Sequence, residues 1–481
     1  MNLTMTEISA LLGAGSATGA GRSARPGMDM GAACGFVPRR ASIDSRKVTP
    51  GDLFFCIRGE RVDGHDFAVE AERNGAVGMV AERRPEGIRP EMPVILVENA
   101  VAALGKLARS AREHTQARVV GVTGSAGKTT VKEMLATVLS VAGATARNFL
   151  NLNNQIGLPL SMLEATGEER FWVMECGISQ AHDMDELGAI LRPDLGLVLN
   201  VGAAHLQGLG DVRGVAAHKA RLLSHVRMPG GLGLACVDYP ELAEEAAKAM
   251  PGCIGFSARG GKARFTGAYV GPEGALSGRF TISLDGASMD VVLPWRGEFA
   301  AENVVAVSAA AHLLGLDMAR IHDGLARCVP AQQRFTCQEA GRILVIDDSY
   351  NANPLSMARS LDAAVALAKN GVCARPLVLV LGEMKELGDD AARAHRELGL
   401  AMAKAAPHAV FWRGGAMRDV VVGLEEGGYA GPMKSLEGVD MFMAQWRELG
   451  FDDAVVLVKG SRSNRMEEFA AGLIEEARDA V

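Results

Sequence analysis

The segment Gly121–Thr130 constrains the fold more than any other part of this chain, because its glycines, lysine and threonines are typical of a phosphate-binding turn. It reads Gly-Val-Thr-Gly-Ser-Ala-Gly-Lys-Thr-Thr, and it follows an apolar strand pattern at Arg118–Val122 and precedes a helical pattern that runs through Leu139. A helix N-terminus after such a turn presents backbone N–H groups and positive potential to an anion. The segment therefore predicts a P-loop, with Lys128 on the β- and γ-phosphates of a nucleotide and the Thr129 hydroxyl on Mg²⁺.

The loop is a variant of the usual Gly-x-x-x-x-Gly-Lys-[Ser/Thr] pattern, since Val122 stands where the first glycine belongs. The alternative is a glycine turn that binds nothing, which the strand before it and the helix after it disfavour. We therefore predict that the chain binds ATP, with these loop residues around the phosphates: Thr123, Gly124, Ser125, Ala126, Gly127, Lys128, Thr129 and Thr130.

Length and composition indicate the class of protein. The 481 residues suggest about three domains, and the 48% hydrophobic and 22% charged residues are ordinary for globular proteins. A net charge of -7 and the lack of a basic stripe argue against a nucleic-acid partner. The eight cysteines include no C-x-x-C pair, which favours reduced thiols over a disulfide framework or a zinc site.

No apolar run approaches the length of a membrane-spanning helix, and the N-terminus lacks the features of a signal peptide. We therefore expect a cytoplasmic monomer without membrane insertion, whose partners are small-molecule substrates. The stretch 13–31, rich in Gly, Ala and Ser, is expected to be a loop or an irregular turn.

The chain reads as three α/β domains. From 1 to 115, short strand-like runs alternate with helical patterns, which predicts a small N-terminal domain. From 116 to 332, short apolar runs bounded by turns predict a parallel sheet around the P-loop, and the part 263–295 reads as an antiparallel addition. From 333 to 481, strands alternate with helices, as in an open, Rossmann-like sheet.

Candidate metal ligands follow two strands of the central segment. Glu175 ends the strand Phe171–Met174, and His205 follows the strand Leu195–Leu199. Ligands gather at the carboxyl ends of parallel strands, so both side chains should reach the same rim as the P-loop. Each alone would be read as a surface carboxylate or a loop histidine, but beside a P-loop the metal role is favoured. Lys219 reads, from its spacing alone, as a solvated helix lysine.

Polar clusters follow three strands of the third segment, at 346–354, 382–388 and 459–462. In the first cluster, Asp348 could accept hydrogen bonds from a ribose, and Asn351 and Asn353 could contact phosphate or a phosphorylated intermediate. The alternative for this cluster is an Asx-rich turn before a helix. Three polar strand ends favour one binding rim over three unrelated turns.

Together these motifs resemble the Mur ligase family of peptidoglycan synthesis, from about Ile43 to the C-terminal helix. The resemblance rests on "DSRKVTPGDLFFCIRGERVDGHDF", "GVTGSAGKTTVKEML", "NLNNQIGLPLSML", "AAHLQGLGDVRGVAAHKARLL", "DDSYNANPLSM", "GEMKELG" and "VLVKGSR". The last four favour the activity that adds D-alanyl-D-alanine. A sibling that adds lysine or diaminopimelate usually shows a Tyr-Ala-His-Thr-Pro-like stretch in place of Ser349–Pro354, and an Asp-Asn-Pro-Arg motif that this chain lacks.

The resemblance implies an ATP-dependent ligase that joins D-alanyl-D-alanine to UDP-N-acetylmuramoyl-tripeptide through an acyl phosphate and releases ADP and phosphate. It implies that segment 1–115 binds the UDP-sugar, segment 116–332 binds ATP with Mg²⁺, and segment 333–481 binds the incoming dipeptide. The adenine region of the family usually reads Gly-x-His-Asn-x-x-Asn, of which this chain retains only Gly297 and Asn303.

The resemblance also implies roles for single residues. Lys219 matches a lysine that the family carbamylates with CO₂, and the adduct is an anionic ligand where an ammonium would repel Mg²⁺. The implied catalytic residues are Lys128, Glu175, His205 and Lys219, and the implied metal ligands are Thr129, Glu175, His205 and the carbamate of Lys219. Further ATP contacts are implied for Asn303, Arg334 and Asp348.

The substrate-binding residues implied in the same way fall into three groups. Ser45 and Arg46 belong to the UDP-sugar-binding domain, and Ser461 and Arg462 meet the dipeptide, with Arg462 on its carboxylate. The remaining positions are Asn151, Asn153 and Asn154 in the central cleft, and Tyr350, Asn351, Asn353 and Lys459 in the third domain.

Two other interpretations stay open at this point. One is a related ligase with another acceptor, such as a folate-polyglutamating enzyme, which the first segment and the "DDSYNANP" stretch disfavour. The other is a P-loop binding or switch protein without ligase chemistry. Glu175, His205 and Lys219 occurring together disfavour that second interpretation.

Overall fold

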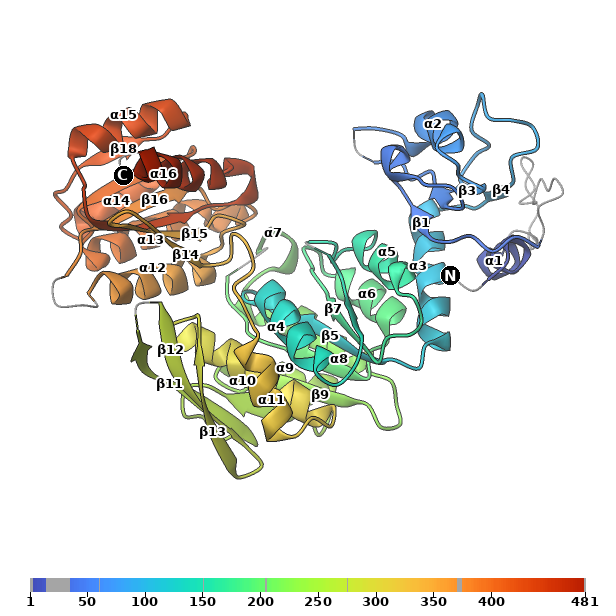
Figure 1. The fold of residues 1–481 in the computed structure, drawn as a ribbon, viewed down its shortest axis with the longest axis horizontal. Coiled ribbons are helices and arrows are strands. Elements are labelled where there is room, and N and C mark those ends of the chain that lie inside the picture. The colour runs from blue at the N-terminus through green and yellow to red at the C-terminus, as the bar shows by residue number, and fades with distance from the viewer. Residues whose placement is uncertain are drawn as a thin grey trace.

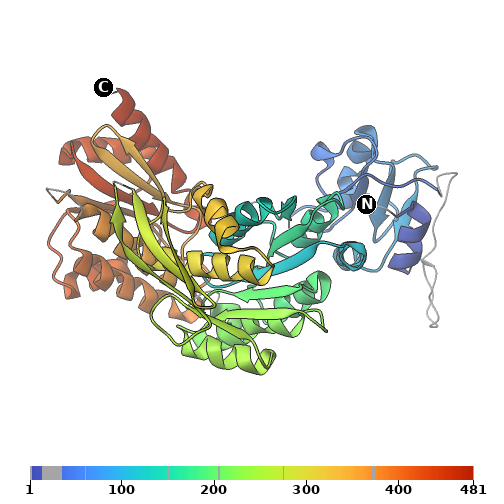
Figure 2. The same ribbon diagram turned by 60° about the horizontal axis from the view of Figure 1, so that its bottom comes forward.

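The computed structural model describes residues 3–13, 35–59, 61–149, 151–203, 206–274, 276–369 and 374–479. These residues form three sheets that follow one another along the chain, each in its own domain (Figures 1 and 2). The central domain lies between the other two (Figure 1). The predicted α/β fold with three domains is confirmed. Most of the stretch 13–31, which was expected to be a loop, lies outside the described residues.

The N-terminal domain is built on a small parallel sheet with the strand order β1-β2-β3-β4. Its strands are β1 (Ala41–Ser42), β2 (Leu53–Phe55), β3 (Gly78–Ala81) and β4 (Val94–Leu96). Its helices are α1 (Met5–Leu12), α2 (Ala68–Arg73) and α3 (Ala100–His114), with 3₁₀ turns η1 (Ser45–Lys47) and η2 (Gly64–Phe67). Asn99 starts α3, because its side chain accepts a hydrogen bond from the N–H of Ala102.

The central domain contains a nine-stranded sheet with the order β13-β12-β11-β10-β9-β8-β5-β7-β6. The strands are β5 (Arg118–Thr123), β6 (Thr145–Arg147), β7 (Phe171–Glu175), β8 (Leu195–Val198), β9 (Leu232–Cys236), β10 (Ile254–Ser257), β11 (Phe265–Glu273), β12 (Ser277–Leu284) and β13 (Ala287–Leu293). Pairing is parallel from β6 to β11 and antiparallel from β11 to β13, so the predicted antiparallel addition extends the same sheet.

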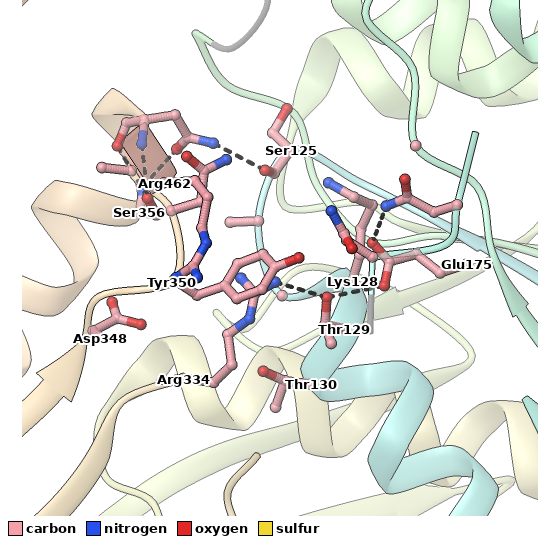
Figure 3. A pocket seen from close by; sticks show the side chains of 18 of the residues that line it. Ser125, Lys128, Thr129, Thr130, Glu175, Arg334, Asp348, Tyr350, Ser356 and Arg462 are labelled. Carbon is pink, nitrogen blue, oxygen red and sulfur yellow. Dashed lines mark hydrogen bonds between the residues drawn. The ribbon is translucent and has the colours of Figure 1, made fainter. Parts of the chain in front are cut away.

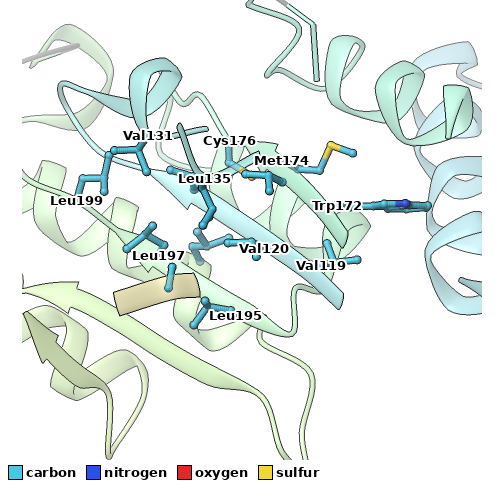
Figure 4. Close-up of a cluster of buried hydrophobic side chains, with 14 of the residues drawn as sticks. Val119, Val120, Val131, Leu135, Trp172, Met174, Cys176, Leu195, Leu197 and Leu199 are labelled. Carbon is cyan, nitrogen blue, oxygen red and sulfur yellow. The ribbon is translucent and has the colours of Figure 1, made fainter. Parts of the chain in front are cut away.

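Helices cover both faces of the parallel part of this sheet. They are α4 (Lys128–Ser140), α5 (Gly157–Glu164), α6 (Asp183–Leu191), α7 (Leu206–Leu209), α8 (Val212–Ser224), α9 (Pro240–Ala249), α10 (Glu298–Leu313) and α11 (Met318–Ala326). Figure 4 shows Val131 and Leu135 of α4 among the strand side chains Val120 and Leu197. Burying each of these apolar side chains contributes about 1.5–3 kcal/mol, which fixes α4 on the sheet and with it the loop at its N-terminus.

The C-terminal domain is a six-stranded sheet with the order β14-β15-β19-β16-β17-β18. Its strands are β14 (Thr336–Ala340), β15 (Ile343–Asp348), β16 (Leu377–Gly382), β17 (Ala409–Arg413), β18 (Met433–Ser435) and β19 (Ala454–Lys459). Its helices are α12 (Pro354–Ala368), α13 (Ala391–Ala405), α14 (Met417–Glu426), α15 (Val439–Leu449) and α16 (Glu467–Asp479), with 3₁₀ turns η3 (Gly388–Asp390) and η4 (Arg462–Asn464). Among the strands described in this sheet, β14 alone runs antiparallel to its neighbour.

Alternate side chains of this sheet enter two separate cores. Leu344 and Ile346 of β15 pack in the core under α12 and α13, and Val345 packs in the core under α15 and α16. Since both faces are covered, the strands read as continuous apolar runs, which is why the sequence predicts them. The carboxyl ends of β15, β16 and β19 lie side by side in the sheet order, and the predicted polar clusters follow them.

No helix within the described ranges has both the length and the apolar character that a membrane crossing requires.

Candidate functional site

A cavity of about 570 Å³ lies where the P-loop faces the carboxyl-end loops of the C-terminal domain (Figure 3). Most of the residues that the sequence assigns to ATP or substrate line it: Ser125, Ala126, Gly127, Lys128, Thr129, Thr130, Asn151, Asn153, Asn154, Glu175, Asn303, Arg334, Asp348, Tyr350, Asn351, Asn353, Lys459 and Arg462. Residues separated by more than three hundred positions thus meet at one place. Each of the three polar strand ends of the third segment contributes to the lining, through Asp348, Glu386 and Lys459.

The P-loop turns into α4 at Gly127, whose φ of +79° is a left-handed conformation that side chains disfavour. A Cβ at this position would lie 2.5 Å from the Oδ1 atom of Asn303, so an alanine here would also displace the Asn303 side chain. The buried Oδ1 atom of Asn303 has no hydrogen-bond partner among the described residues. Asn303 therefore lies against the loop, as its predicted nucleotide role needs.

Lys128 folds back over the loop, and its Nζ atom donates to the carbonyl oxygen of Gly124 at 2.8 Å. Burial lowers the pKa of the Lys128 ammonium, while the negative charge of Glu175 acts in the opposite direction. A phosphate in the loop would offer the lysine a charged acceptor in place of a backbone carbonyl, which makes a stronger hydrogen bond. Thr123 and Gly124 themselves do not line the cavity, and Thr123 is fully buried.

Glu175 ends β7 beside the first turn of α4 and is almost fully buried. Its Oε2 atom accepts a hydrogen bond from the Thr129 hydroxyl at 2.9 Å, and its Oε1 atom accepts one from Nδ2 of Asn153 at 2.8 Å. A carboxylate and a hydroxyl held this close at the mouth of a phosphate loop are the oxygen ligands that Mg²⁺ prefers. The residues present therefore fit a magnesium ion.

Arg334 reaches the same hydroxyl from the C-terminal segment. Its Nη2 atom donates to Thr129 Oγ1 at 2.9 Å, and its guanidinium carbon lies 3.8 Å from the centroid of the Tyr350 ring (Figure 3). Stacking on an aromatic face holds the planar guanidinium in one orientation while its remaining N–H groups stay available. Arg334 is thus placed to add positive charge beside a phosphate.

Lys219 lies on α8 and is fully buried, which corrects its reading as a solvated helix lysine. Its Nζ atom has no hydrogen-bond partner among the described residues. Burial, together with the charge of Lys128, holds the pKa of Lys219 well below its usual range. An unpaired buried ammonium is unfavourable, so a neutral amine, or an amine converted to another group, fits this environment better. His205, the other predicted ligand, lies outside the described residues.

The Asp348 carboxylate at the end of β15 is held by protein groups. Its Oδ1 atom accepts from the N–H of Phe335 at 3.1 Å, and its Oδ2 atom lies 2.5 Å from both Lys459 Nζ and Ser360 Oγ. Lys459 is buried and also donates to the carbonyl of Asn351 at 2.9 Å. Lys459 thus fixes the loop after β15 from the neighbouring strand.

Two residues after β19 take different positions. Arg462 lines the cavity, half exposed, with its guanidinium carbon 6.0 Å from the Tyr350 ring and Nη1 3.0 Å from Glu467. Ser461 is buried, does not line the cavity, and its Oγ atom accepts from the N–H of Lys385 at 2.9 Å.

Ser45 and Arg46 lie in η1 of the N-terminal domain, away from this cavity. The turn is capped by Asp44, whose carboxylate also binds Arg46 at 2.9 Å. Ser45 donates to Glu70 of α2 at 2.5 Å. Ser45 is buried and Arg46 is exposed, so of these two residues only Arg46 is open to a ligand.

The cavity also has lining residues that the sequence interpretation missed. They are Gln155, Gly177, Ile178, Ser179, Asp183, Trp295, Phe299, Phe335, Ser356, Arg359, Ser360 and Glu386. Ser356 and Ser360 could have been found, because they follow Asn353 at helical spacing and share a face of α12. The aromatic residues read as core positions, and no sequence signal separates a core aromatic from one at a cavity edge.

The chain is similar to known proteins along most of its length. Family models described as "Mur ligase family, catalytic domain", "Mur ligase middle domain" and "Mur ligase, glutamate ligase domain" match residues 40–112, 122–311 and 333–462. A protein of Escherichia coli (strain K12) named UDP-N-acetylmuramoyl-tripeptide--D-alanyl-D-alanine ligase is 34% identical over 440 residues, which cover 90% of this chain and 93% of that protein. A Bacillus subtilis (strain 168) protein of the same name is 30% identical over 438 residues, with coverages of 90% and 93%.

Solved structures agree with the sequence matches. A crystal structure of MurF from Acinetobacter baumannii superposes with a TM-score of 0.80 at 30% identity, and covers 91% of this chain and 93% of that chain. MurF ligase from Thermotoga maritima in complex with ADP superposes with a TM-score of 0.78 at 28% identity, with coverages of 92% and 99%.

Proposed function

Because this chain belongs to the Mur ligase family, we propose that it is an ATP-dependent ligase that joins D-alanyl-D-alanine to UDP-N-acetylmuramoyl-tripeptide in peptidoglycan synthesis. The observation that carries the proposal is the cavity in which the P-loop, the Thr129–Glu175 pair and Arg334 meet. Transfer of phosphate to a substrate requires that the nucleotide phosphates and the substrate be held side by side. A cavity with the P-loop of one domain on one side and the polar loops of another domain on the other side meets that requirement.

The reaction proceeds in two steps. The terminal carboxylate of the tripeptide attacks the γ-phosphorus of ATP, the bond to the β-phosphate oxygen breaks, and ADP and an acyl phosphate form. The amine of D-alanyl-D-alanine then attacks the acyl carbon and loses a proton, and inorganic phosphate leaves. The product is UDP-N-acetylmuramoyl-pentapeptide.

Lys128 and Arg334 are assigned to the charge that develops on the transferred phosphoryl group. Lys128 exchanges the Gly124 carbonyl for a phosphate oxygen, and Arg334 already lies beside the Thr129 hydroxyl. Preorganised charges in a site closed to water stabilise a transition state more strongly than exposed ones. Docking of the C-terminal domain over the P-loop also protects the acyl phosphate from hydrolysis.

The metal site is assigned to Thr129, Glu175, His205 and Lys219, and Mg²⁺ bound there would polarise the phosphate oxygens. For Lys219 we propose a carbamate: the neutral amine attacks CO₂, a carbon–nitrogen bond forms, and a proton is released. Full burial of the amine and the lack of a partner for it among the described residues support this assignment. A carbamate gives the buried position a negative charge that a metal ion can neutralise.

The three domains divide the substrates between them in this proposal. Segment 1–115, with Ser45 and Arg46, takes the UDP-sugar, and segment 116–332 takes ATP. Segment 333–481 takes the dipeptide, with Arg462 on its carboxylate, which a half-exposed guanidinium at the cavity edge supports. A cytoplasmic monomer remains our prediction.

The test is phosphate release in the presence of ATP, Mg²⁺, UDP-N-acetylmuramoyl-tripeptide and D-alanyl-D-alanine, with each component omitted in turn. We expect release only with all four, and a pentapeptide product by mass spectrometry. If phosphate is released with a different acceptor but not with D-alanyl-D-alanine, the protein is a related ligase, such as a folate-polyglutamating enzyme. Nucleotide binding without any substrate-dependent release would indicate a P-loop switch protein.

A further inference from the structure

A buried group of side chains joins the P-loop to the C-terminal domain, and the mechanism above does not use it. At its centre, Glu302 of α10 is 1% exposed. Side chains from three other places reach its two carboxylate oxygens, namely Asn200, Tyr239 and Arg359. A buried carboxylate is unfavourable unless it is paired and hydrogen-bonded, and these three donors meet that need. The neighbours of Glu302 on α10 are mostly buried alanine and valine, so the helix does not require a carboxylate for its own packing.

The P-loop end of the group is Asn200, which is fully buried after β8. Its Nδ2 atom donates to Glu302 Oε1 at 2.6 Å and to the carbonyl of Ala126 at 3.0 Å. Its Oδ1 atom accepts from the N–H of Ala126 at 2.8 Å. Asn200 therefore holds both polar groups of the residue that precedes Gly127, where the loop turns into α4.

The C-terminal end of the group is Arg359 on α12, whose side chain is 11% exposed. Its Nη2 atom lies 2.8 Å from Glu302 Oε2 and 3.0 Å from Oε1, and it also donates to the hydroxyl of Tyr239. The start of the same helix also contacts the P-loop, since its N-cap residue Asn353 donates from Nδ2 to the carbonyl of Ser125 at 3.1 Å. One helix of the C-terminal domain thus reaches two consecutive residues of the loop, one directly and one through Glu302 and Asn200.

We propose that Glu302 and Arg359 are positioning residues that couple docking of the C-terminal domain to the shape of the P-loop, so that nucleotide phosphates bind tightly only while the domain is docked. The inference rests on the proposed function, because it takes ATP as the ligand of the loop. Undocking removes Arg359 from Glu302, which keeps its hydrogen bonds from Asn200 and Tyr239 of the central domain. A buried pair of this kind therefore adds orientation to the docked state without locking the domains together. Loss of either partner leaves the other charge buried and unpaired in the docked state, which favours undocking.

The test compares Glu302→Gln, Arg359→Met and the double variant in calorimetric titrations with Mg·ADP, a readout that does not need turnover. Each single variant should raise the Kd for Mg·ADP about tenfold, as expected for the loss of a hydrogen bond to a charged group. The double variant should bind no more weakly than the single variants, because both act through one pair. Arg359→Lys, which keeps the charge, should recover most of the affinity.

Arg396→Met is the matched control, because Arg396 is a half-exposed arginine of the same domain whose partner Glu426 lies in that domain at 2.6 Å. It should leave the Kd unchanged. Unchanged Kd values in Glu302→Gln or Arg359→Met, even with a lowered Tm, would overturn the inference and leave only an interface ion pair. Multiplicative effects in the double variant would overturn it as well. Failure of the proposed function is seen separately, in wild-type protein that shows no substrate-dependent phosphate release.

Discussion

Arg334 donates a hydrogen bond to the hydroxyl oxygen of Thr129 at 2.9 Å, although 205 positions separate the two residues in the chain. Thr129 lies in the first turn of the P-loop helix, and Arg334 lies just before the first strand of the C-terminal sheet. The nucleotide site of the central domain is therefore completed by a residue that arrives only when the third domain packs against it. Substitutions at this contact separate the contribution of the guanidinium from that of the domain.

Replacing Arg334 with alanine should lower kcat/KM for ATP about 100-fold, in the range seen when one donor to a developing charge is removed. Arg334→Lys should recover only part of the loss, since lysine keeps the charge but neither the flat stacking on Tyr350 nor the fixed direction of the donor. Steady-state phosphate release measures both. Arg342→Ala removes an exposed arginine of the same domain, paired with Asp453, and serves as the control. A change of less than threefold in Arg334→Ala would contradict the assigned role.

Gly127→Ala should weaken nucleotide binding by about tenfold or more, for two separable reasons. The φ of +79° is strained for alanine, and the new Cβ would lie 2.5 Å from Oδ1 of Asn303. The strain costs about 1–2 kcal/mol and remains in any background, whereas Asn303→Gly removes the overlap. We expect the double variant to recover part of the affinity for Mg·ADP in calorimetry, and Asn303→Gly alone to measure the contribution of the asparagine. Equal binding by wild type and Gly127→Ala would contradict the requirement for glycine.

The sequence predicts the P-loop and its flanking strand and helix closely, because each position of a phosphate-binding turn tolerates few residue types. The expected strand Arg118–Val122 and the helix through Leu139 correspond to β5 and α4. Short strands with polar residues were missed, such as β14, which reads Thr-Cys-Gln-Glu-Ala at a sheet edge. An edge strand has one neighbour and an exposed face, so it carries little apolar pattern.

Contacts between distant side chains were the other part that the sequence could not supply. Helical spacing alone predicts a solvated Lys219, because spacing does not show which sheet covers a helix. In the structure, α8 packs on the central strands. The pairing of Glu302 with Arg359 joins two helices in different domains. The hydrophobic periodicity of neither helix predicts this contact. Such pairs are specified by the packing of domains and not by any local pattern.

Lys219→Met should separate stability from activity. Methionine is apolar and similar in length, so it relieves a buried amine without leaving a cavity, and the Tm should stay the same or rise. Ligase activity should fall by at least about 100-fold, because the variant cannot form the proposed carbamate ligand of the metal. In ¹³C-bicarbonate, ¹³C NMR of the wild type should show a carbamate carbon that the variant lacks, while Lys248→Met, an exposed lysine, should retain it. A fully active Lys219→Met protein would contradict the assignment.

His395 on α13 should make the C-terminal domain less stable in mild acid. The ring is fully buried, its Nδ1 atom donates to the carbonyl of Ala391 at 2.7 Å, and its Nε2 atom accepts from the N–H of Met384 at 3.0 Å. A carbonyl only accepts and a backbone N–H only donates, so these partners require the neutral ring. Met384 belongs to the loop after β16 that reaches the cavity at Glu386.

Burial lowers the pKa of His395 below its ordinary value of 6.5. As the pH falls below 6.5, the unfolded chain takes up a proton while the folded protein stays neutral, so the free energy of unfolding decreases. The decrease continues until the pH reaches the lower, folded pKa, with a slope of at most about 1.4 kcal/mol per pH unit. Chemical unfolding between pH 7.5 and 5, monitored by tryptophan fluorescence, should therefore show a steeper loss of unfolding free energy for the wild type than for His395→Gln, because glutamine does not titrate. His408→Gln, at an exposed position of the same domain, should follow the wild type. Parallel pH profiles for the wild type and His395→Gln would show that this histidine does not hold the loop through its neutral form.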